Sequence, residues 1–568
     1  MTAKKTILYL QLPRLDTDTE SSAENLALAA LYLRCSLERS GERTYYQFLP
    51  QMLQADSLDD NHCMSSIAKI HPAVIVVTLY AWNIERSISL LRRLKDLKPE
   101  TVCLAGGPEV AREHPFLWRS KVFSAAVEGE GEVVFPGILK ALRTGRRLQY
   151  SNVAWRVAGE YEWGDRKPPD VEFAASLPPP AWHHMMPDTG GMGYIESGRG
   201  CSWRCAFCCY NQRRTRQGWL SARETLQRIR IMVRRGAREI RFIDPTFNSN
   251  PMFEEILKGL ARMNVGRKVS FFAELRAETL TSAQCEMLTK ANFEEVEVGV
   301  QSRSISVLRA ICRPSDPRAT ERGIRLLAGS GIKTTVDIMC GLPGQSLRDI
   351  TASLRWASRI RGVSVQFLHT LLLPGTELRR NRRKLKLSAG SRPPYRVRRT
   401  ELLSAQDMMK AERVARRMSG TDQDFSTRRF VGFRIPELFA ERIRLSTDDL
   451  HNTVIPGREN KRALIIAGED LFSIRNAICT TIRNAILNEP HVLWQFVLSP
   501  AREEPLDLLS MAADEIDGLP RQFIDRMTFS ERGDEIVSRR IFVMLRRGRR
   551  YSRRWMAASE EYLRTRFF

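Results

Sequence analysis

The first 150 residues alternate between short apolar runs and amphipathic stretches. The run Ala73–Thr78 is rich in β-branched residues, which is typical of a strand buried on both faces. Ser22–Ser40 and Ile84–Leu97 carry the helical spacing of apolar positions. Five strands are expected in all: Thr6–Leu12, Thr44–Phe48, Ala73–Thr78, Thr101–Ala105 and Ala125–Val127. Strands joined by helical crossovers predict a doubly wound, Rossmann-like parallel sheet over residues 1–150, with ligands beyond the carboxyl ends of its strands.

A connector is expected over residues 151–190, where Pro178–Pro180 interrupt any regular pattern. The alternation then resumes, with six further strands expected at Tyr194–Ser197, Glu239–Ile243, Val269–Glu274, Glu295–Val300, Thr334–Ile338 and Val363–Leu368. Six βα units predict a partial or full parallel barrel over residues 191–385. Its active site should lie at the carboxyl ends of the strands.

The last third of the chain has a different texture. Residues 386–568 begin in a basic stretch that contains Pro393–Pro394, and the pattern that follows is mostly helical. Apolar runs such as Ala463–Ala467 and Val492–Leu498 require a core of their own. We therefore expect a mostly helical C-terminal domain with a substrate-binding or accessory role.

The chain is strongly basic, with 89 Lys and Arg against 65 Asp and Glu and a formal net charge of +24. The bases gather in residues 376–399 and 539–554. Each cluster is either a solvated surface or an anion-binding patch. No stretch of about 18 apolar residues is found, and the first apolar run is too short for a signal peptide. No membrane span is expected, and the cytoplasm is the expected compartment.

Three of the eleven cysteines lie within eight residues, in the segment Gly198–Cys208 that follows the first expected barrel strand. Their spacing is Cys-x3-Cys-x2-Cys, at Cys201, Cys205 and Cys208. A four-iron cluster usually takes four thiolates, so three would leave one iron open to a ligand. Zinc or chance spacing are the alternatives, but zinc would require a fourth His or Cys nearby. The spacing favours a [4Fe-4S] cluster.

The segment GRGCSWRCAFC, the barrel pattern and the preceding α/β domain resemble the radical S-adenosylmethionine (radical SAM) enzymes that carry an N-terminal cobalamin-binding domain. The resemblance covers roughly residues 1–380. It implies that the open iron binds S-adenosylmethionine and that an electron from the cluster cleaves the sulfonium to a 5′-deoxyadenosyl radical. It also implies an external electron donor such as flavodoxin or ferredoxin.

The resemblance also implies contacts with S-adenosylmethionine at the ends of the later strands. Asp244 and Thr246 stand where the family contacts the methionine amino group, although the usual Gly-Gly-Glu is replaced. Glu274 and Arg276 are the candidate catalytic pair and offer polar groups to the cofactor carboxylate and ribose. Further candidates at strand ends are Gln301, Asp337 and Gly341. Taken singly, each could be an ordinary βα turn.

In the N-terminal domain, the resemblance implies that cobalamin binds at three loops. The candidates are Trp82, Asn83, Gly106, Gly107, Pro108, Glu128, Gly129, Glu130 and Gly131. The Asp-x-His-x-x-Gly motif that would supply an axial histidine is missing after the first strand, so cobalamin would bind without a protein imidazole. A domain that has lost ligand binding is the alternative.

These features favour a cobalamin-dependent radical SAM methyltransferase that acts on a carbon centre of a small natural product or peptide. A cyclase or rearrangement enzyme of the same kind is one alternative. A nucleic-acid-binding protein with a structural cluster is another, which the lack of a known RNA-binding module disfavours. The arginines of residues 376–399 predict an anionic or peptide-like substrate held between the barrel and the C-terminal domain.

Overall fold

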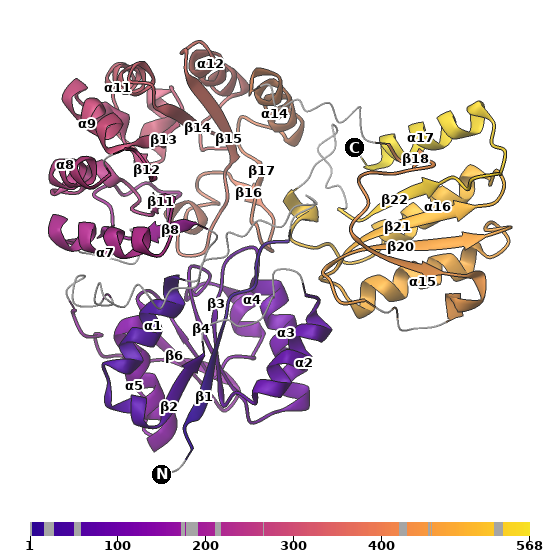
Figure 1. Cartoon of the computed structure of the whole chain (residues 1–568), viewed down its shortest axis with the longest axis horizontal. Helices are drawn as coiled ribbons and strands as arrows, with labels where there is room; N and C mark the ends of the chain where they lie inside the picture. Colours follow the sequence, from indigo (N-terminus) through magenta and orange to yellow (C-terminus); the bar gives the residue numbers. More distant parts are fainter. Residues whose placement is uncertain are drawn as a thin grey trace.

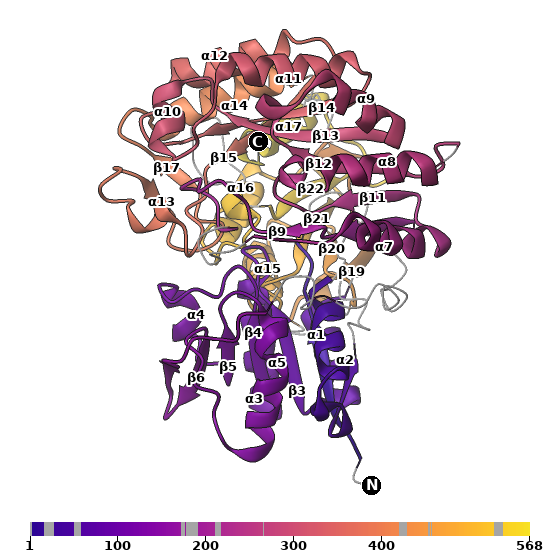
Figure 2. The same cartoon turned by 90° about the vertical axis from the view of Figure 1, so that its left-hand side faces the viewer.

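The computed structural model describes residues 3–15, 28–49, 58–171, 177, 191–210, 217–264, 266–419, 429–451, 455, 457–527 and 538–567. Three α/β bodies follow one another along the chain (Figure 1). The N-terminal body lies beneath the barrel, as Figure 2 also shows, and the C-terminal body lies to the side of both. Within the described residues, no helix combines the length and apolar character that crossing a bilayer requires.

The N-terminal sheet has the strand order β2-β1-β3-β4-β5-β6-β7. Its five parallel strands confirm the predicted pattern: β1 (Lys5–Leu10), β2 (Tyr46–Leu49), β3 (Val74–Thr78), β4 (Val102–Gly106) and β5 (Ala125–Val127). Helices α1 (Leu28–Glu38) and α5 (Gly131–Thr144) pack on one face. Helices α2 (Asp60–Ile70), α3 (Ile84–Leu97) and α4 (Pro115–Arg119) cover the other. The order reverses between β1 and β3, which is where sheets of this kind bind ligands.

The sheet continues into the expected connector. Strand β6 (Val153–Val157) pairs antiparallel with β5, and β7 (Glu160–Trp163) pairs antiparallel with β6, so residues 153–163 belong to the first domain. The proline run Pro178–Pro180 lies outside the described residues.

A six-stranded parallel sheet forms the barrel, in the order β15-β14-β13-β12-β11-β8. Its strands match the expected positions closely: β8 (Met192–Ile195), β11 (Glu239–Phe242), β12 (Ser270–Leu275), β13 (Phe293–Gln301), β14 (Lys333–Cys340) and β15 (Val363–His369). The outer layer consists of α7 (Ala222–Arg234), α8 (Phe253–Met263), α9 (Ser282–Ala291), α11 (Pro317–Gly329), α12 (Leu347–Ser358) and α14 (Ala405–Ser419). β8 and β15 are the sheet's two edges, so the barrel is partial.

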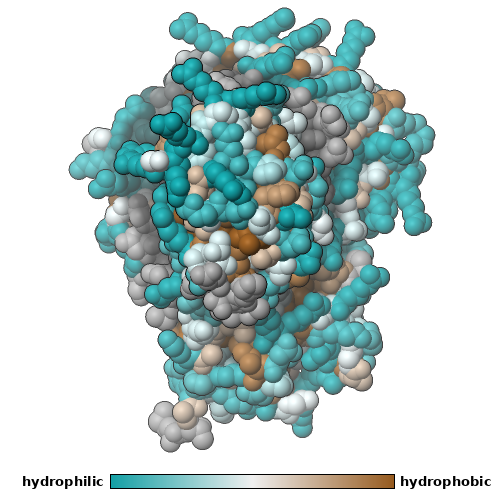
Figure 3. Space-filling view, turned by 90° about the vertical axis from the view of Figure 1, so that its right-hand side faces the viewer, coloured by the Kyte–Doolittle hydropathy of each residue, from teal (hydrophilic) through white to brown (hydrophobic). Residues whose placement is uncertain are grey.

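The prediction of a mostly helical C-terminal domain is wrong. Residues 430–567 form a five-stranded parallel sheet in the order β18-β22-β21-β20-β19, with α15 (Arg475–Asn488), α16 (Leu506–Asp517) and α17 (Arg553–Phe567). Its strands are β18 (Val431–Gly432), β19 (Glu441–Leu445), β20 (Lys461–Gly468), β21 (Leu493–Pro500) and β22 (Arg540–Met544). The two apolar runs singled out above are the central strands β20 and β21, which are buried. The face of the molecule on this side is largely hydrophilic (Figure 3).

Residues 371–399, here called the strap, connect the three bodies and contain β16 (Ser388–Ala389) and β17 (Val397–Arg399). Gly375 N donates to Glu113 in the N-terminal domain over 2.7 Å. Tyr395, fully buried, donates its hydroxyl to Glu109 of the same domain over 2.7 Å. From the C-terminal domain, Arg526 donates to Pro393 O. The strap is therefore a structural element rather than a free basic linker.

A buried ion-pair network joins the N-terminal and C-terminal domains. The Arg462 side chain is 0% exposed and pairs with Asp59, Glu441 and Glu489. Asp59 belongs to the N-terminal domain, is 1% exposed and also caps α2. Because the pair is buried, removal of one partner leaves the other charge desolvated.

Arg462→Ala should therefore cost about 3–5 kcal/mol of the free energy that holds the C-terminal domain folded and docked. Denaturant unfolding followed by tryptophan fluorescence measures this, because Trp494 packs beside Arg462. Arg483→Ala is the matched control, since its pair with Glu515 is solvent-exposed on the arginine side and should contribute little to stability. Equal losses for both variants would contradict the assignment.

Candidate active site

The cysteine loop leaves the carboxyl end of β8 and packs against the start of the strap. Cys205 is buried, and Cys201 and Cys208 are partly exposed. Ala206 N donates to Ile311 O over 2.9 Å, and Leu378 N of the strap donates to Ala206 O over 2.9 Å. The backbone of the loop is thus held from two sides.

The three thiols suit an iron–sulfur cluster. Burial raises the pKa of Cys208 to about 12, and Cys209, Cys205 and Cys201 add to that rise because their thiols lie close by. No group of three or more His, Cys, Asp or Glu within the described ranges is compact enough to hold one metal ion.

Arg276, at the end of β12, contacts the cysteine loop. Its guanidinium lies 3.7 Å from the centre of the Trp203 ring, between Cys201 and Cys205. It also pairs with Glu278 and donates to Pro314 O over 3.0 Å. Asn248 bonds the backbone of Arg276 through both its donor and its acceptor. These contacts place Arg276 against the loop that carries the cysteines, while its Nη1 is buried with no hydrogen-bond partner in the described part of the chain.

Carboxyl groups line the inside of the barrel. Glu274 on β12 and Glu297 on β13 are direct neighbours in the strand register, and Asp337 on β14 lies opposite Gly299. Burial, followed by repulsion from Glu297, raises the pKa of Asp337 to about 9. The same two causes raise the pKa of Glu274 to about 7, although water reaches this side chain through the barrel mouth. The lumen therefore offers negative charge that a cation would stabilise.

Asp244 lies deeper, at the end of β11. It accepts hydrogen bonds from Ser197 Oγ over 2.7 Å and Ser197 N over 3.0 Å, yet burial raises its pKa to about 7. Thr246 Oγ1 stands 3.6 Å from Cys201 Sγ. These two residues connect the end of the strand to the first cysteine.

A β-bulge directs Gln301 toward these carboxylates. The β13–β14 register shifts between Gly299 and Gln301, and Gln301 adopts the left-handed region with φ 67°. Its amide lies over Gly299, where an added Cβ would stand only 2.5 Å from Gln301 Nε2. Gln301 Oε1 and Asp337 Oδ1 are buried and have no hydrogen-bond partner in the described part of the chain. Strained, unsatisfied polar groups of this kind mark a ligand site.

Arg313 completes the polar lining and was not identified from the sequence. Its Nη1 donates to Cys205 Sγ over 3.4 Å, and its Nη2 donates to Gly299 O. It also lowers the pKa of Asp337, against the larger effect of burial. A guanidinium, carboxylates and an amide beside three thiols match the carboxylate, amino, sulfonium and ribose groups of S-adenosylmethionine. Gly341, in contrast, packs under α14 against Met408.

The N-terminal loops divide into ligand-facing and structural residues. Tyr80 and Trp82 stack at 4.3 Å, and Trp82 stays 37% exposed beyond β3. This flat aromatic surface suits a planar macrocycle such as cobalamin. Asn83 is fully buried, and its amide bonds Tyr80 N, Leu12 O and Thr78 O, so it shapes the loop.

The second predicted loop has a strict backbone requirement. Gly107 has φ 99°, and a Cβ there would stand 2.7 Å from Leu79 O, so only glycine fits. Gly106 precedes it with open space on its Cα, and Pro108 and Glu109 follow. Glu109 is fully engaged with His114 and Tyr395.

The acidic loop at the end of β5 meets the cysteine loop. Arg199, two residues before Cys201, pairs with Glu132 and with Glu196, and its Nη1 lies 3.5 Å from Glu130 Oε2. Glu128 lies 3.9 Å from Arg112, while Gly129 has φ 86° and Gly131 begins α5. The carboxyl end of the N-terminal sheet therefore docks onto the cysteine side of the barrel (Figures 1 and 2).

Comparison with known proteins agrees with this arrangement. The model of the radical SAM superfamily matches residues 195–357. An uncharacterized methyltransferase of Pyrococcus horikoshii is 23% identical over 337 residues, which cover 57% of this chain and 73% of that protein. The cobalamin-dependent radical SAM methyltransferase TokK of Streptomyces tokunonensis is 25% identical over 308 residues, which cover 50% of this chain but only 45% of TokK.

The fold matches a solved structure from the same group. The radical S-adenosylmethionine methyltransferase TsrM of Kitasatospora setae, solved with cobalamin and a [4Fe-4S] cluster, superposes with a TM-score of 0.54 at 17% identity. The match covers 66% of this chain and 77% of TsrM. Residues 195–357 thus match the radical SAM superfamily, and the fold of the chain resembles that of a radical SAM methyltransferase solved with cobalamin.

Proposed function

We propose that this radical SAM enzyme is a cobalamin-dependent methyltransferase that acts on a carbon centre of a natural product or peptide. The observation that carries the proposal is the docking of the acidic loop at the carboxyl end of β5 against the cysteine loop through Arg199. Two ligands held at these facing ends would meet in one chamber. TokK and TsrM, the relatives named above, are methyltransferases.

Each residue group has a proposed role. Cys201, Cys205 and Cys208 would hold the cluster, which supplies the electron that cleaves S-adenosylmethionine. Glu274, Gln301, Asp337 and Arg313 would bind the cofactor's charged groups, with Asp244 and Thr246 at its amino end. Arg276 and Asn248 hold the cysteine loop in place. Trp82 and the loops at Gly106–Pro108 and Glu128–Gly131 would bind cobalamin, with Asn83 fixing the turn.

Anaerobic reconstitution tests the proposal. The purified chain, supplied with iron, sulfide and cobalamin, should bind both groups. With S-adenosylmethionine and dithionite, the enzyme should produce 5′-deoxyadenosine by reductive cleavage. It should also produce S-adenosylhomocysteine, because S-adenosylmethionine donates methyl groups to cobalamin. Release of 5′-deoxyadenosine without S-adenosylhomocysteine would favour a cyclase or rearrangement enzyme. Binding of RNA with no cleavage of S-adenosylmethionine would overturn the proposal.

The carboxylates of the lumen predict a pH dependence. Glu274 has its pKa raised to about 7, so it gains negative charge as the pH rises from 6 to 7.5. S-adenosylmethionine carries a sulfonium, and its affinity should rise over this range on the order of fivefold. Equilibrium dialysis with the reconstituted enzyme measures this. Glu274→Gln should reduce the dependence and leave the part due to Asp244, whose pKa burial also raises to about 7. Glu286→Gln, on the exposed face of α9, should leave the dependence unchanged. A flat profile for the unmodified enzyme would contradict the assignment of Glu274.

A further inference from the structure

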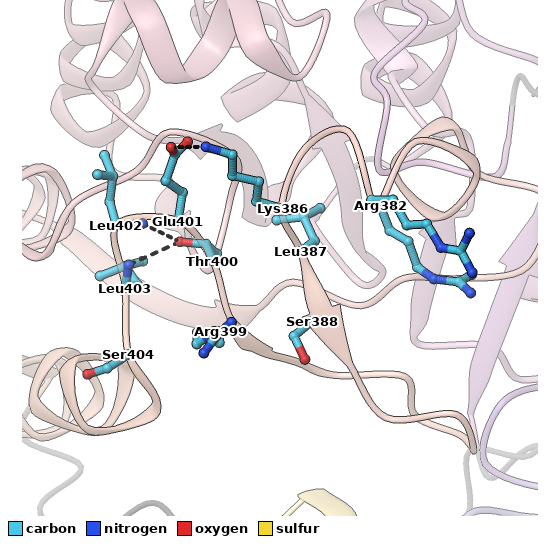
Figure 4. Close-up of a pocket in the computed structure, with 11 residues that line it drawn as sticks. Arg382, Lys386, Leu387, Ser388, Arg399, Thr400, Glu401, Leu402, Leu403 and Ser404 are labelled. Carbon is cyan, nitrogen blue, oxygen red and sulfur yellow. Dashed lines mark hydrogen bonds and ion pairs between the residues drawn. The ribbon is translucent and has the colours of Figure 1, made fainter.

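The most basic exposed part of the strap forms a cavity of about 690 Å³. Arg382, Arg383, Lys386 and Arg399 line it, together with one acid, Glu401. Glu401 is already paired with Lys386, and Figure 4 shows Arg382 pointing away from that pair. Within the described residues, the structure gives Arg382, Arg383 and Arg399 no acidic partner.

A short antiparallel pairing holds these charges together. Ser388 of β16 lies opposite Arg399 of β17, so Arg399 is carried beside the turn that bears Arg382 and Arg383. Lys386 and Leu387 close this turn through backbone bonds to Arg383 and Arg382. The positive charge is therefore fixed in place rather than spread over a loose linker.

The patch follows closely on the part of the strap that packs against the cysteine loop. Leu378, four residues before Arg382, is buried and donates its N–H to Ala206 O between Cys205 and Cys208. The cavity lining comes entirely from residues 382–404 and includes none of Glu274, Glu297, Gln301 or Asp337. A substrate bound there would not face the lumen, whereas an electron needs only a donor close to the cluster.

We infer that this patch, which we call the basic docking patch (Arg382, Arg383 and Arg399), binds an acidic one-electron carrier protein of the flavodoxin or ferredoxin type. The inference rests on the proposed function, because it supplies the electron that the cluster requires. The carrier is oxidised by one electron and the cluster is reduced by one, with no bond made or broken. Weak electron-transfer complexes use small, charged interfaces, and a net charge of +24 attracts an acidic partner to the protein, on whose surface the patch supplies a local cluster of cations.

The test uses the reconstituted full-length enzyme and an acidic flavodoxin. Arg382→Glu, Arg383→Glu and Arg399→Glu together should raise the Kd for flavodoxin about tenfold or more, by removing attraction and adding repulsion. Reduction of the cluster by flavodoxin hydroquinone should slow by a similar factor. Reduction by dithionite, a small reductant, should not change, and this also shows that the cluster is intact. Binding to the unmodified enzyme should weaken as salt rises.

A matched control keeps the net charge equal. Arg547→Glu, Arg550→Glu and Arg553→Glu alter exposed arginines of the C-terminal domain and, like the first set, lower the formal charge from +24 to +18. Equal weakening by both sets would overturn the patch in favour of a general charge effect. A raised KM for substrate with unchanged flavodoxin binding would also overturn it and make the patch a substrate site.

A milder double variant and an assay with dithionite separate a failure of the patch from a failure of the proposed function. Should the triple variant lose its cluster, Arg382→Gln with Arg383→Gln takes its place, and unchanged flavodoxin binding in that variant counts against the patch. Absence of S-adenosylmethionine cleavage with dithionite in the unmodified enzyme would count against the proposed function instead. The binding measurement does not depend on that activity.

Discussion

Replacement of Cys201, Cys205 and Cys208 by Ala should abolish both iron binding and S-adenosylmethionine cleavage. The unmodified chain should hold about four irons and absorb near 400 nm after anaerobic reconstitution, as thiolate-bound four-iron clusters do. The triple variant has lost every thiolate of the loop except Cys209, and adjacent side chains on one backbone do not converge on one cubane. Iron analysis and the visible spectrum measure the loss of the cluster, and release of 5′-deoxyadenosine measures the loss of cleavage.

Cys209→Ala is the control for this prediction. Cys209 borders Cys208 and contributes to its environment, but the spacing of the other three makes Cys209 dispensable. This variant should keep its iron and its cleavage activity to within a few fold. A triple variant that still carried the cluster would remove the basis for the assignment.

Neutralising Glu130 and Glu132 together, as Glu130→Gln and Glu132→Gln, should reduce methyl transfer about 100-fold, while reductive cleavage of S-adenosylmethionine continues. These carboxylates form ion pairs with Arg199 of the cysteine loop, and the ion pairs fix the orientation of the N-terminal domain relative to the barrel. A displacement of about 1 Å between reacting groups is enough for a loss of this size. The cleavage chemistry takes place within the barrel, and Glu196 still holds Arg199 there.

Parallel assays of 5′-deoxyadenosine and of methylated product separate the two steps. Glu160→Gln removes an exposed ion pair with Lys121 in the same domain and should change neither step. If the double variant methylates at the normal rate, the contact with Arg199 does not position the domains. If it loses both steps equally, the acidic loop supports the cluster rather than the alignment.

The strands of the first two domains could be predicted because their hydrophobic periods are unambiguous. β3 is a short run rich in Val and Ile, residues that favour a strand, and helices such as α3 have one apolar face. The C-terminal sheet was missed for a physical reason. A buried strand such as β21 carries Leu, Trp and Phe with a single Val, so neither its composition nor a period separates it from a buried helix.

The cysteines of the site could be predicted because their spacing lies within one loop. Arg199 and Arg313 could not, because their partners come from other elements: Glu132 from α5 and Cys205 from the cysteine loop. The sequence likewise cannot show that the side-chain amide of Asn83 is fully hydrogen-bonded to backbone groups around its own turn. Contacts between distant segments depend on the packing of domains, which no local pattern records.

The strap also defines where this protein can be divided into exchangeable modules. It holds Tyr395 against Glu109, and α14 follows it with Met408, Ala411 and Ala415 in the barrel core. A chimera joined at residue 385 would break this unit and expose apolar surface of the barrel, whatever domain was attached. A junction after Ser419 keeps the strap, α14 and the barrel together as one structural unit. A chimera that takes its C-terminal domain from a relative should therefore keep the barrel folded when it is joined at that position.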